Sequence, residues 1–340
     1  MRSSKPIIVS MGEPSGISSE IIIKAWLKRN LYKIPPFILV DDLRKLNQVN
    51  RFFNLKANFQ AITKDNNINE IFSRSIPVID LKANIDFNPG KPNPTNSKYV
   101  LKSITEAFEF VHMQKSSGML TLPVCKTTLK KAKFNFNGQT EYLSYLASKK
   151  NKKKYSEIMI LSTTKPADKG KNLVVGLITT HIPLKKIHKL IDQKIIYEKI
   201  IAFRNSLSTI WKIKSPKIGI TSLNPHAGEE GLIGTEEKEI IKPILKKCTK
   251  NQIKIIGPLS SDSCFHKSTR EKFDGILCFY HDQGLIPVKT LDFNHSINIT
   301  GGLPFLRVSP DHGPAFDIAK ENVASLESLI ASFNFLRERF

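Results

Sequence analysis

Short apolar runs alternate along the chain with longer segments in which apolar residues recur every three or four positions. Ile7 to Val9, Phe37 to Val40 and Gly275 to Phe279 are continuous apolar runs of strand length. Residues 96–114 carry one apolar stripe at helical spacing, which predicts an amphipathic helix. Strands without alternation are typical of a sheet covered on both faces, so the pattern predicts an α/β protein with a mostly parallel sheet.

The remaining elements follow the same alternation. Further helices are predicted at about 17–27 and 195–210, and further strands at about 118–124, 157–162, 173–180, 217–221, 253–256 and 296–298. The strands on either side of the polar residues 163–171 are predicted to form a hairpin, and Thr235-Glu236-Glu237 suits the start of a helix. The polar stretch from Tyr280 to Lys289 is interpreted as a turn that follows a buried strand.

Length predicts two lobes. A chain of 340 residues can bury a sizeable core and most readily divides into two parts. We expect a first α/β lobe of residues 1–125 plus about 295–340, and a second α/β lobe of residues 126–294 that carries the candidate metal-binding histidines.

Composition narrows the class of function. The formal net charge of +22 comes from basic residues spread over the whole length, with one dense lysine cluster within residues 149–154. Aromatic residues are not interleaved with this cluster, and a bias toward Lys, Ile and Asn accounts for much of the charge. Both observations argue against a basic nucleic-acid-binding protein, which stays a distant alternative. A positive field that attracts anionic substrates is the milder consequence.

Two absences in the sequence bear on location. No apolar run approaches the roughly 18 residues of a membrane span. The four cysteines are scattered without paired spacing, which argues against a zinc ribbon or a disulfide framework. Together with an N-terminus that lacks a signal segment, these features favour a cytoplasmic protein.

Three histidines, His181, His226 and His281, occupy the same kind of place, because each follows an apolar strand. Ligands of open α/β sheets lie beyond the carboxyl ends of strands. Three neutral imidazoles with an open fourth position form a catalytic site for a divalent metal, commonly zinc, with Mg, Mn or Co as alternatives. The other interpretation is that these are three unrelated loop or core histidines, since residues far apart in sequence are often far apart in space.

Polar residues suited to an anion follow the last of these histidines. Lys289, Asn298 and Arg307 would offer a phosphate or carboxylate a point charge, an amide and a planar fork. Taken singly, such residues are more often solvated surface groups. Near the N-terminus, the glycines of the turn at residues 12–16 lie four apart, so this turn is not the GxGxxG fingerprint of Rossmann dinucleotide-binding proteins.

Several long motifs carry a family resemblance, in the same order along the chain. They are Met11-Gly12-Glu13-Pro14-Ser15-Gly16-Ile17, Thr179-Thr180-His181-Ile182-Pro183-Leu184, Leu223-Asn224-Pro225-His226-Ala227-Gly228-Glu229 with Gly234-Thr235-Glu236-Glu237, Tyr280 to Lys289, Gly302-Leu303-Pro304-Phe305, and Asp311-His312-Gly313. With these motifs the sequence resembles the 4-hydroxythreonine-4-phosphate dehydrogenase family of pyridoxal phosphate synthesis. The resemblance covers nearly the full chain and is weakest between about residues 42 and 97.

The resemblance implies a homodimer of two-lobed α/β subunits, related in fold to isocitrate and isopropylmalate dehydrogenases, with the active site at the lobe cleft and near the dimer interface. It implies oxidation of 4-phosphohydroxy-L-threonine with NAD or NADP and a divalent metal (Zn, Mg or Co). The product would be 2-amino-3-oxo-4-phosphooxybutanoate, which decarboxylates to 3-amino-2-oxopropyl phosphate.

The resemblance also implies residue roles, carried over by position in the motifs. The metal ligands would be His181, His226 and His281, and the catalytic groups would be Asp262 and Lys126. The substrate-binding residues would be Gln139, Thr140, Lys289, Asn298 and Arg307. The loop that binds the adenine side of NAD would contain Asp311, His312, Gly313, Ala315 and Asp317.

The chain departs from the family pattern at several positions. Gln139 stands where the family has a histidine, and a glutamine donates hydrogen bonds but neither carries charge nor shuttles a proton. Ser18-Ser19 stand where the family has Gly-Pro, and Leu122 where it has a glycine. None of these departures affects the three histidines. They leave open a sister dehydrogenase that acts on another phosphorylated hydroxy acid, such as a phosphothreonate or phosphoerythronate.

Overall fold

The computed structural model describes residues 5–63, 66–171 and 173–339, so residues 1–4 of the predicted N-terminal segment lie outside the described residues. The chain divides into two compact units, residues 1–146 with 305–340 and residues 147–304. The first unit therefore extends past residue 125, where we expected a boundary. The additional residues belong to it because Thr128 donates a hydrogen bond to Glu13, and Gln139 donates one to the carbonyl of Leu122.

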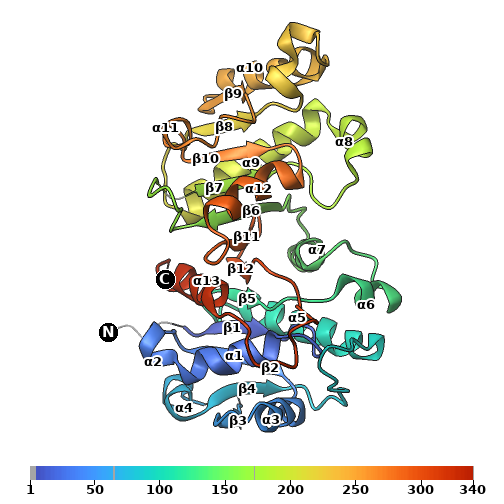
Figure 1. Cartoon of the computed structure of the whole chain (residues 1–340), viewed down its shortest axis with the longest axis vertical. Helices are drawn as coiled ribbons and strands as arrows, with labels where there is room; N and C mark the ends of the chain where they lie inside the picture. The colour runs from blue at the N-terminus through green and yellow to red at the C-terminus, as the bar shows by residue number, and fades with distance from the viewer. Residues whose placement is uncertain (1–4, 64–65, 172, 340) are drawn as a thin grey trace. The chain divides into compact units, whose positions relative to one another are not determined.

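The described part of the first unit contains a parallel sheet with the strand order β3-β4-β2-β1-β5-β12 (Figure 1). The strands are β1 Ile7–Ser10, β2 Phe37–Asp41, β3 Phe59–Ala61, β4 Ile76–Asp80, β5 Met119–Thr121 and β12 Arg307–Pro310. Since β1 and β5 are parallel, Ser10 lies beside Thr121 at the carboxyl edge of this sheet. Arg307 pairs with Met119 and opens the neighbouring strand.

Helices precede or follow these strands along the chain. They are α1 Ser18–Leu27, α2 Arg29–Tyr32, α3 Leu43–Phe52, α4 Ile68–Arg74, the 3-10 helix η1 Pro94–Asn96, α5 Ser97–His112, α6 Lys126–Lys131, α7 Gln139–Asn151 and α13 Glu327–Arg337. The aromatic core of this unit includes Phe37, whose ring stacks on Phe333 at a centroid distance of 5.2 Å and meets Phe72 edge-on at 5.0 Å.

The described part of the second unit has the strand order β11-β6-β7-β10-β8-β9. The strands are β6 Ile158–Thr163, β7 Leu173–Leu177, β8 Ile218–Thr221, β9 Ile255–Leu259, β10 Gly275–Cys278 and β11 Ile297–Gly301. β6 is antiparallel to both β7 and β11, which confirms the predicted hairpin, and β7, β10, β8 and β9 are parallel. The predicted α/β class with mostly parallel strands is thereby confirmed.

The helical elements of the second unit are α8 Leu184–Leu190, α9 Gln193–Ile210, the 3-10 segment η2 Pro225–Gly231, the π-helical turn η3 Glu237–Ile241, α10 Lys242–Lys250, α11 Lys267–Arg270 and α12 His281–Leu291. Among the helices in the described ranges, none combines the length and the apolar character that a membrane crossing requires.

The helix α12 occupies the stretch that we interpreted as a polar turn. Gly284 and Pro287 disfavour a helix by propensity, and tertiary packing outweighs them. A Cβ on Gly284 would lie 2.6 Å from Leu177 and 3.0 Å from Val175, so the glycine lets α12 approach β7 closely. His281 is consequently the first residue of a helix packed on the sheet, and its backbone is held by that packing.

Close contact between a helix and the sheet also depends on two glycines beneath Phe203 of α9. A Cβ would lie 2.8 Å from the Phe203 ring at Gly176 and 2.6 Å from it at Gly275. Both distances are shorter than real Cβ contacts, and Phe203 is fully buried. The ring therefore uses the space that the absent side chains leave on neighbouring strands.

We expect Gly275→Ala to destabilise the protein by about 1–3 kcal/mol, because an added methyl group overpacks the core against Phe203. Denaturant unfolding of the variant measures the loss. Adding Phe203→Leu should recover part of it, because the smaller side chain removes the clash. A Gly275→Ala variant that is as stable as the natural chain would contradict this packing.

Candidate active site

Two of the three predicted metal ligands lie side by side in the second unit. β7 and β10 are parallel neighbours, and their alignment continues past the strands, since the amide of Thr179 donates to the carbonyl of Phe279 at 3.1 Å. His181 and His281 each lie two residues after this aligned pair, and their ring centroids lie 5.3 Å apart. Strand pairing therefore brings together two imidazoles that are distant in sequence.

His226 lies on an unusual turn after β8. Five successive residues, 226–230, have positive φ angles between 43° and 76°. The left-handed conformation costs a residue with a Cβ roughly 1–2 kcal/mol, and only Gly228 adopts it freely. Strain of this kind is concentrated at functional sites and requires anchoring contacts nearby.

The buried carboxylate of Glu237 anchors this turn. Its Oε1 accepts hydrogen bonds from the amides of Leu223 at 2.8 Å and Asn224 at 2.7 Å, and its Oε2 accepts one from the Asn224 side chain at 2.9 Å. A Cβ on Gly228 would lie 2.7 Å from the same carboxylate, so the glycine makes room for it. Glu237 thus holds the chain just before His226 and packs closely against Gly228 after it.

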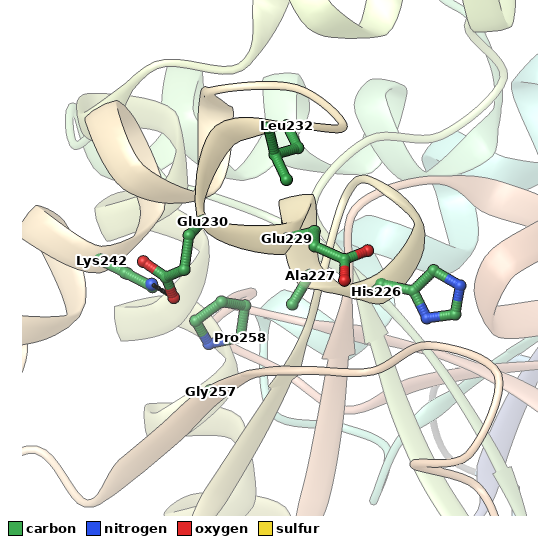
Figure 2. Close-up of a pocket in the computed structure, with 8 residues that line it drawn as sticks. All are labelled: His226, Ala227, Glu229, Glu230, Leu232, Lys242, Gly257 and Pro258. Atoms are coloured by element: carbon green, nitrogen blue, oxygen red, sulfur yellow. Dashed lines mark hydrogen bonds and ion pairs between the residues drawn. The ribbon is translucent and has the colours of Figure 1, made fainter.

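An open pocket of about 680 Å³ adjoins the turn (Figure 2). Its lining residues are His226, Ala227, Glu229, Glu230, Leu232, Lys242, Gly257 and Pro258. Glu230 turns toward Lys242 and pairs with it at 2.9 Å, while the His226 ring lies on the opposite side of the turn. The ion pair therefore leaves the exposed imidazole of His226 accessible to a ligand.

A buried amide ties the strand ends of the second unit together. Oε1 of Gln283 accepts hydrogen bonds from the amide of Phe279 at 2.7 Å and the hydroxyl of Thr221 at 2.8 Å. Its Nε2 donates to the carbonyl of Ser222 at 2.7 Å and the hydroxyl of Ser261 at 2.9 Å. These partners lie just before the segments that carry the predicted site residues, so Gln283 sets the spacing of those segments.

Asp262, a predicted catalytic residue, is exposed in the loop after β9. A hydrogen bond from the hydroxyl of Ser260 at 2.7 Å is the main cause that lowers the pKa of its carboxyl group, and His226 acts in the same direction. A carboxyl group with a lowered pKa stays ionised at neutral pH. Asp262 is therefore suited to stabilising positive charge near His226.

One chain does not group all three histidines. Within residues 5–63, 66–171 and 173–339, no three His, Cys, Asp or Glu side chains are arranged so that they could hold a metal ion. The chemistry of the donors suits a divalent metal, because two imidazoles are adjacent, but the third is not grouped with them. The metal-binding role of the three histidines stays a prediction.

Two predicted phosphate ligands also belong to the second unit. Lys289 lies on α12, with its ammonium group 5.0 Å from the ring centroid of Phe293. Asn298 lies in β11 opposite Leu161, and its Oδ1 is buried without a hydrogen-bond partner among the described residues. Because the oxygen and nitrogen of an amide are assigned by their partners, this side chain is able to turn its NH₂ group toward an anion.

In the first unit, Arg307 is buried, and its guanidinium group reaches Thr121 at the carboxyl end of β5. Its Nε and Nη2 donate to the hydroxyl of Thr121 at 2.9 and 2.6 Å, and its Nη1 lies 3.4 Å from the hydroxyl of Thr140. Burial lowers the pKa of Arg307 to about 10, and the Glu141 carboxylate opposes this shift. The guanidinium group is still charged at neutral pH and is held in place by neutral hydroxyl groups, an arrangement suited to binding an anion.

Two more predicted residues lie near this arginine in sequence or space. Gln139 begins α7, and its Nε2 donates to the carbonyl of Leu122 at 3.1 Å. Lys126 begins α6 and reaches solvent, although the loss of water around its amine lowers its pKa, with Glu141 opposing the shift. A lysine with a lowered pKa releases its proton more easily than an ordinary one, which suits acid–base chemistry.

The predicted cofactor loop lies on the first turn of the chain. The amide of Ile17 donates to the carbonyl of Pro314 at 3.0 Å, and the amide of Asp311 bonds the hydroxyl of Ser328 at 3.0 Å. A Cβ on Gly313 would meet nothing within 4 Å, so the loop has open space beside it. Exposed Asp317 is available to accept hydrogen bonds from hydroxyl groups such as those of a ribose. The loop is thus compatible with a dinucleotide.

Two positioning residues, Gln283 and Glu237, were not identified from the sequence. Both lie inside motifs that we quoted, and Glu237 was interpreted only as part of a helix start. Their partners are backbone groups at strand ends, which leave no periodic signal. The one available sequence signal is a polar residue within an otherwise buried stretch.

Comparison with known proteins places the chain in a family. Residues 33–336 match the family model described as "Pyridoxal phosphate biosynthetic protein PdxA". The 4-hydroxythreonine-4-phosphate dehydrogenase of Methylorubrum populi is 34% identical over 330 residues, which cover 96% of this chain and 92% of that protein. The enzyme of the same name from Erythrobacter litoralis is 35% identical over 322 residues, covering 94% and 92%.

Solved structures agree with this assignment. The crystal structure of 4-hydroxythreonine-4-phosphate dehydrogenase from Klebsiella pneumoniae superposes with a TM-score of 0.82 at 30% identity, covering 98% of this chain and 99% of that one. The expected α/β fold of two units is confirmed by this superposition over nearly the full chain. The match over most of the chain shows that it belongs to the PdxA family of pyridoxal phosphate biosynthetic proteins.

Proposed function

We propose that the chain oxidises 4-phosphohydroxy-L-threonine with NAD or NADP, as a 4-hydroxythreonine-4-phosphate dehydrogenase of pyridoxal phosphate synthesis. Family membership and the names of its relatives support the reaction. The structural observation that supports it best is the buried guanidinium of Arg307, which Thr121 and Thr140 hold ready for an anionic group. Lys289 and Asn298 stay predicted partners of the same phosphate.

The reaction removes a hydride from the carbon that bears the hydroxyl group and a proton from its oxygen. The product 2-amino-3-oxo-4-phosphooxybutanoate is a β-keto acid, so it loses CO₂ and takes up a proton to give 3-amino-2-oxopropyl phosphate. Lys126, with its lowered pKa, is the residue that we assign to accept the hydroxyl proton. Ionised Asp262 would stabilise positive charge, and Arg307 would orient the reacting carbon through the distant phosphate.

A dehydrogenase of this family implies a nicotinamide cofactor and a divalent metal. We propose that His181, His226 and His281 hold the metal (zinc, magnesium or cobalt) and that Asp311, His312, Gly313, Ala315 and Asp317 bind the adenine side of the dinucleotide. A bound metal would polarise the substrate hydroxyl group, and a bound nicotinamide would accept the hydride.

We further propose a homodimer with the histidines near its interface. A large exposed apolar side chain lies close in sequence to each of them: Leu184 is 68% exposed, Leu232 86% and Ile286 65%. Large exposed apolar side chains are typical of surfaces that a partner covers. Among the described residues, His181 lies beside His281 and no group of three metal-ligating side chains is present, so we propose that dimer formation completes the set of ligands. The four free cysteines are compatible with the cytoplasmic location that we propose.

A sister dehydrogenase for another phosphorylated hydroxy acid is the second candidate. The observation that favours it is Gln139, which stands where the family has a histidine and belongs to the predicted substrate-binding residues. Both candidates use the same anion site, so the substrate that gives NADH formation distinguishes them.

We expect Arg307→Lys to raise KM for 4-phosphohydroxy-L-threonine about 10- to 100-fold, because a point charge cannot reproduce the planar fork. NADH formation measured over a range of substrate concentrations checks this. Arg270→Lys is the matched control, since Arg270 is also buried but is paired with Asp168 at 2.6 Å. Equal changes in KM for both variants would show that Arg307 has no role in binding.

We expect His226→Ala to lose metal-dependent NADH formation, as chelator treatment should in the natural chain. His266→Ala, which removes an exposed histidine bonded to Ser268 at 2.9 Å, should retain it. Metal content of the purified variants provides a second readout. A His226→Ala protein that keeps both its metal and its turnover would rule out the proposed ligand.

We expect Leu232→Lys to shift the protein from dimer to monomer in sedimentation, because a charge would have to be buried in the interface. Leu31→Lys is the control, since Leu31 is 73% exposed in α2 of the first unit and far in sequence from the histidines. A dimer that survives in Leu232→Lys at micromolar concentration would place the interface elsewhere.

A further inference from the structure

Gln139 uses one half of its side-chain amide and leaves the other half unpaired. Its Nε2 donates to the carbonyl of Leu122 at 3.1 Å, and its Oε1 is buried with no hydrogen-bond partner in the part of the chain that is described. The residue is only 9% exposed, so bulk water does not readily replace a partner. A buried acceptor without a partner is costly for a folded protein, which suggests that a ligand supplies the donor.

The orientation of this amide is fixed by its neighbour. Turning the amide over would bring Oε1 against the carbonyl oxygen of Leu122, and two acceptors do not bond. The unpaired atom of Gln139 is therefore an acceptor and not a donor. One N–H of the NH₂ group is used by Leu122 and the second stays a donor, so the atom that the described residues leave buried and unpaired is the acceptor Oε1.

The unpaired oxygen belongs to the same part of the first unit as the anion site. Leu122 follows Thr121, the hydroxyl of which accepts two hydrogen bonds from Arg307, and Thr140 follows Gln139. The guanidinium group attracts phosphate or carboxylate, whereas a carbonyl oxygen repels them. A substrate that suits both groups carries an anion and, on another carbon, a hydrogen-bond donor.

We propose that Gln139 determines specificity by accepting a hydrogen bond from the ammonium group of the substrate. This proposal rests on the proposed function and names the part of the substrate that the residue recognises. A hydroxyl group on the same carbon forms a neutral and weaker hydrogen bond, and a hydrogen atom leaves Oε1 buried and unpaired. The expected order of preference is therefore amine, then hydroxyl, then neither.

Three ligands that differ at one carbon test the order: 4-phosphohydroxy-L-threonine, 4-phosphoerythronate, and 3-hydroxy-4-phosphobutanoate, which carries hydrogen at that carbon. Both kcat/KM for NADH formation and the calorimetric Kd are measured for each. We expect the natural chain to favour the amine over the unsubstituted compound by about 100-fold, since a charge-assisted hydrogen bond is gained. Gln139→Met, of similar length but without the amide, should reduce that ratio at least about tenfold.

Gln139→Glu keeps an acceptor and adds a charge, so the folded variant should retain or increase the preference for the amine. Its second oxygen replaces Nε2 beside the Leu122 carbonyl, so we expect this variant to be less stable than the natural chain. Thermal unfolding identifies variants that are destabilised. An unchanged ratio in folded Gln139→Met overturns the proposal, as does a natural chain that treats all three ligands alike. If no ligand yields NADH but calorimetry retains the order, the proposed function fails while the role of Gln139 stands.

Discussion

One side-chain amide holds together the strand ends that carry the candidate chemistry of the second unit. Gln283 makes four hydrogen bonds, to Thr221, Ser222, Ser261 and Phe279, and is itself buried. Each buried group that loses its hydrogen-bond partner would reduce the stability of the fold by about 1–3 kcal/mol. The four hydrogen bonds are therefore expected to form or break together. Its effect is to convert the register of β8 and β10 into a fixed spacing between the loops that follow them. His281 and the turn of His226 depend on that spacing.

In the first unit, the important feature is a buried positive charge, the guanidinium group of Arg307, which is in place before a ligand binds. Removing a guanidinium from water is costly unless its donors are bonded. Thr121 accepts two of the donors of Arg307 without neutralising its charge, and a pKa of about 10 keeps the group cationic at neutral pH. An arriving phosphate then gains charge-assisted hydrogen bonds with a group that is already oriented. Orientation before binding is what reduces the entropic cost of holding the substrate.

Much of the architecture could be predicted from periodicity, because burial on one face or on both leaves a local pattern. The strands, the hairpin of β6 and β7 and the mostly parallel sheet fall in this class. The sequence placed His181 and His281 after strands, but only the pairing of β7 with β10 shows that these two residues are neighbours. Features that depend on tertiary contacts leave no such local pattern in the sequence. The helix α12 was not predicted because Gly284 and Pro287 have low helix propensity. Three other features depend on residues distant in sequence, so the local sequence does not predict them. They are the hydrogen bonds of Glu237, the left-handed turn at 226–230 and the unpaired oxygen of Gln139.

The positions at which this chain departs from its family separate into two kinds by a physical test. Ser19 accepts a hydrogen bond from the buried ammonium of Lys45 at 2.8 Å, and the same ammonium pairs with Asp41 at 2.7 Å. That substitution is satisfied within the protein, so it needs no ligand to explain it. Gln139 is equally buried but leaves an acceptor unpaired among the described residues. Natural proteins keep such defects mainly where function requires them, so this departure, and not Ser19, is the one that bears on substrate choice.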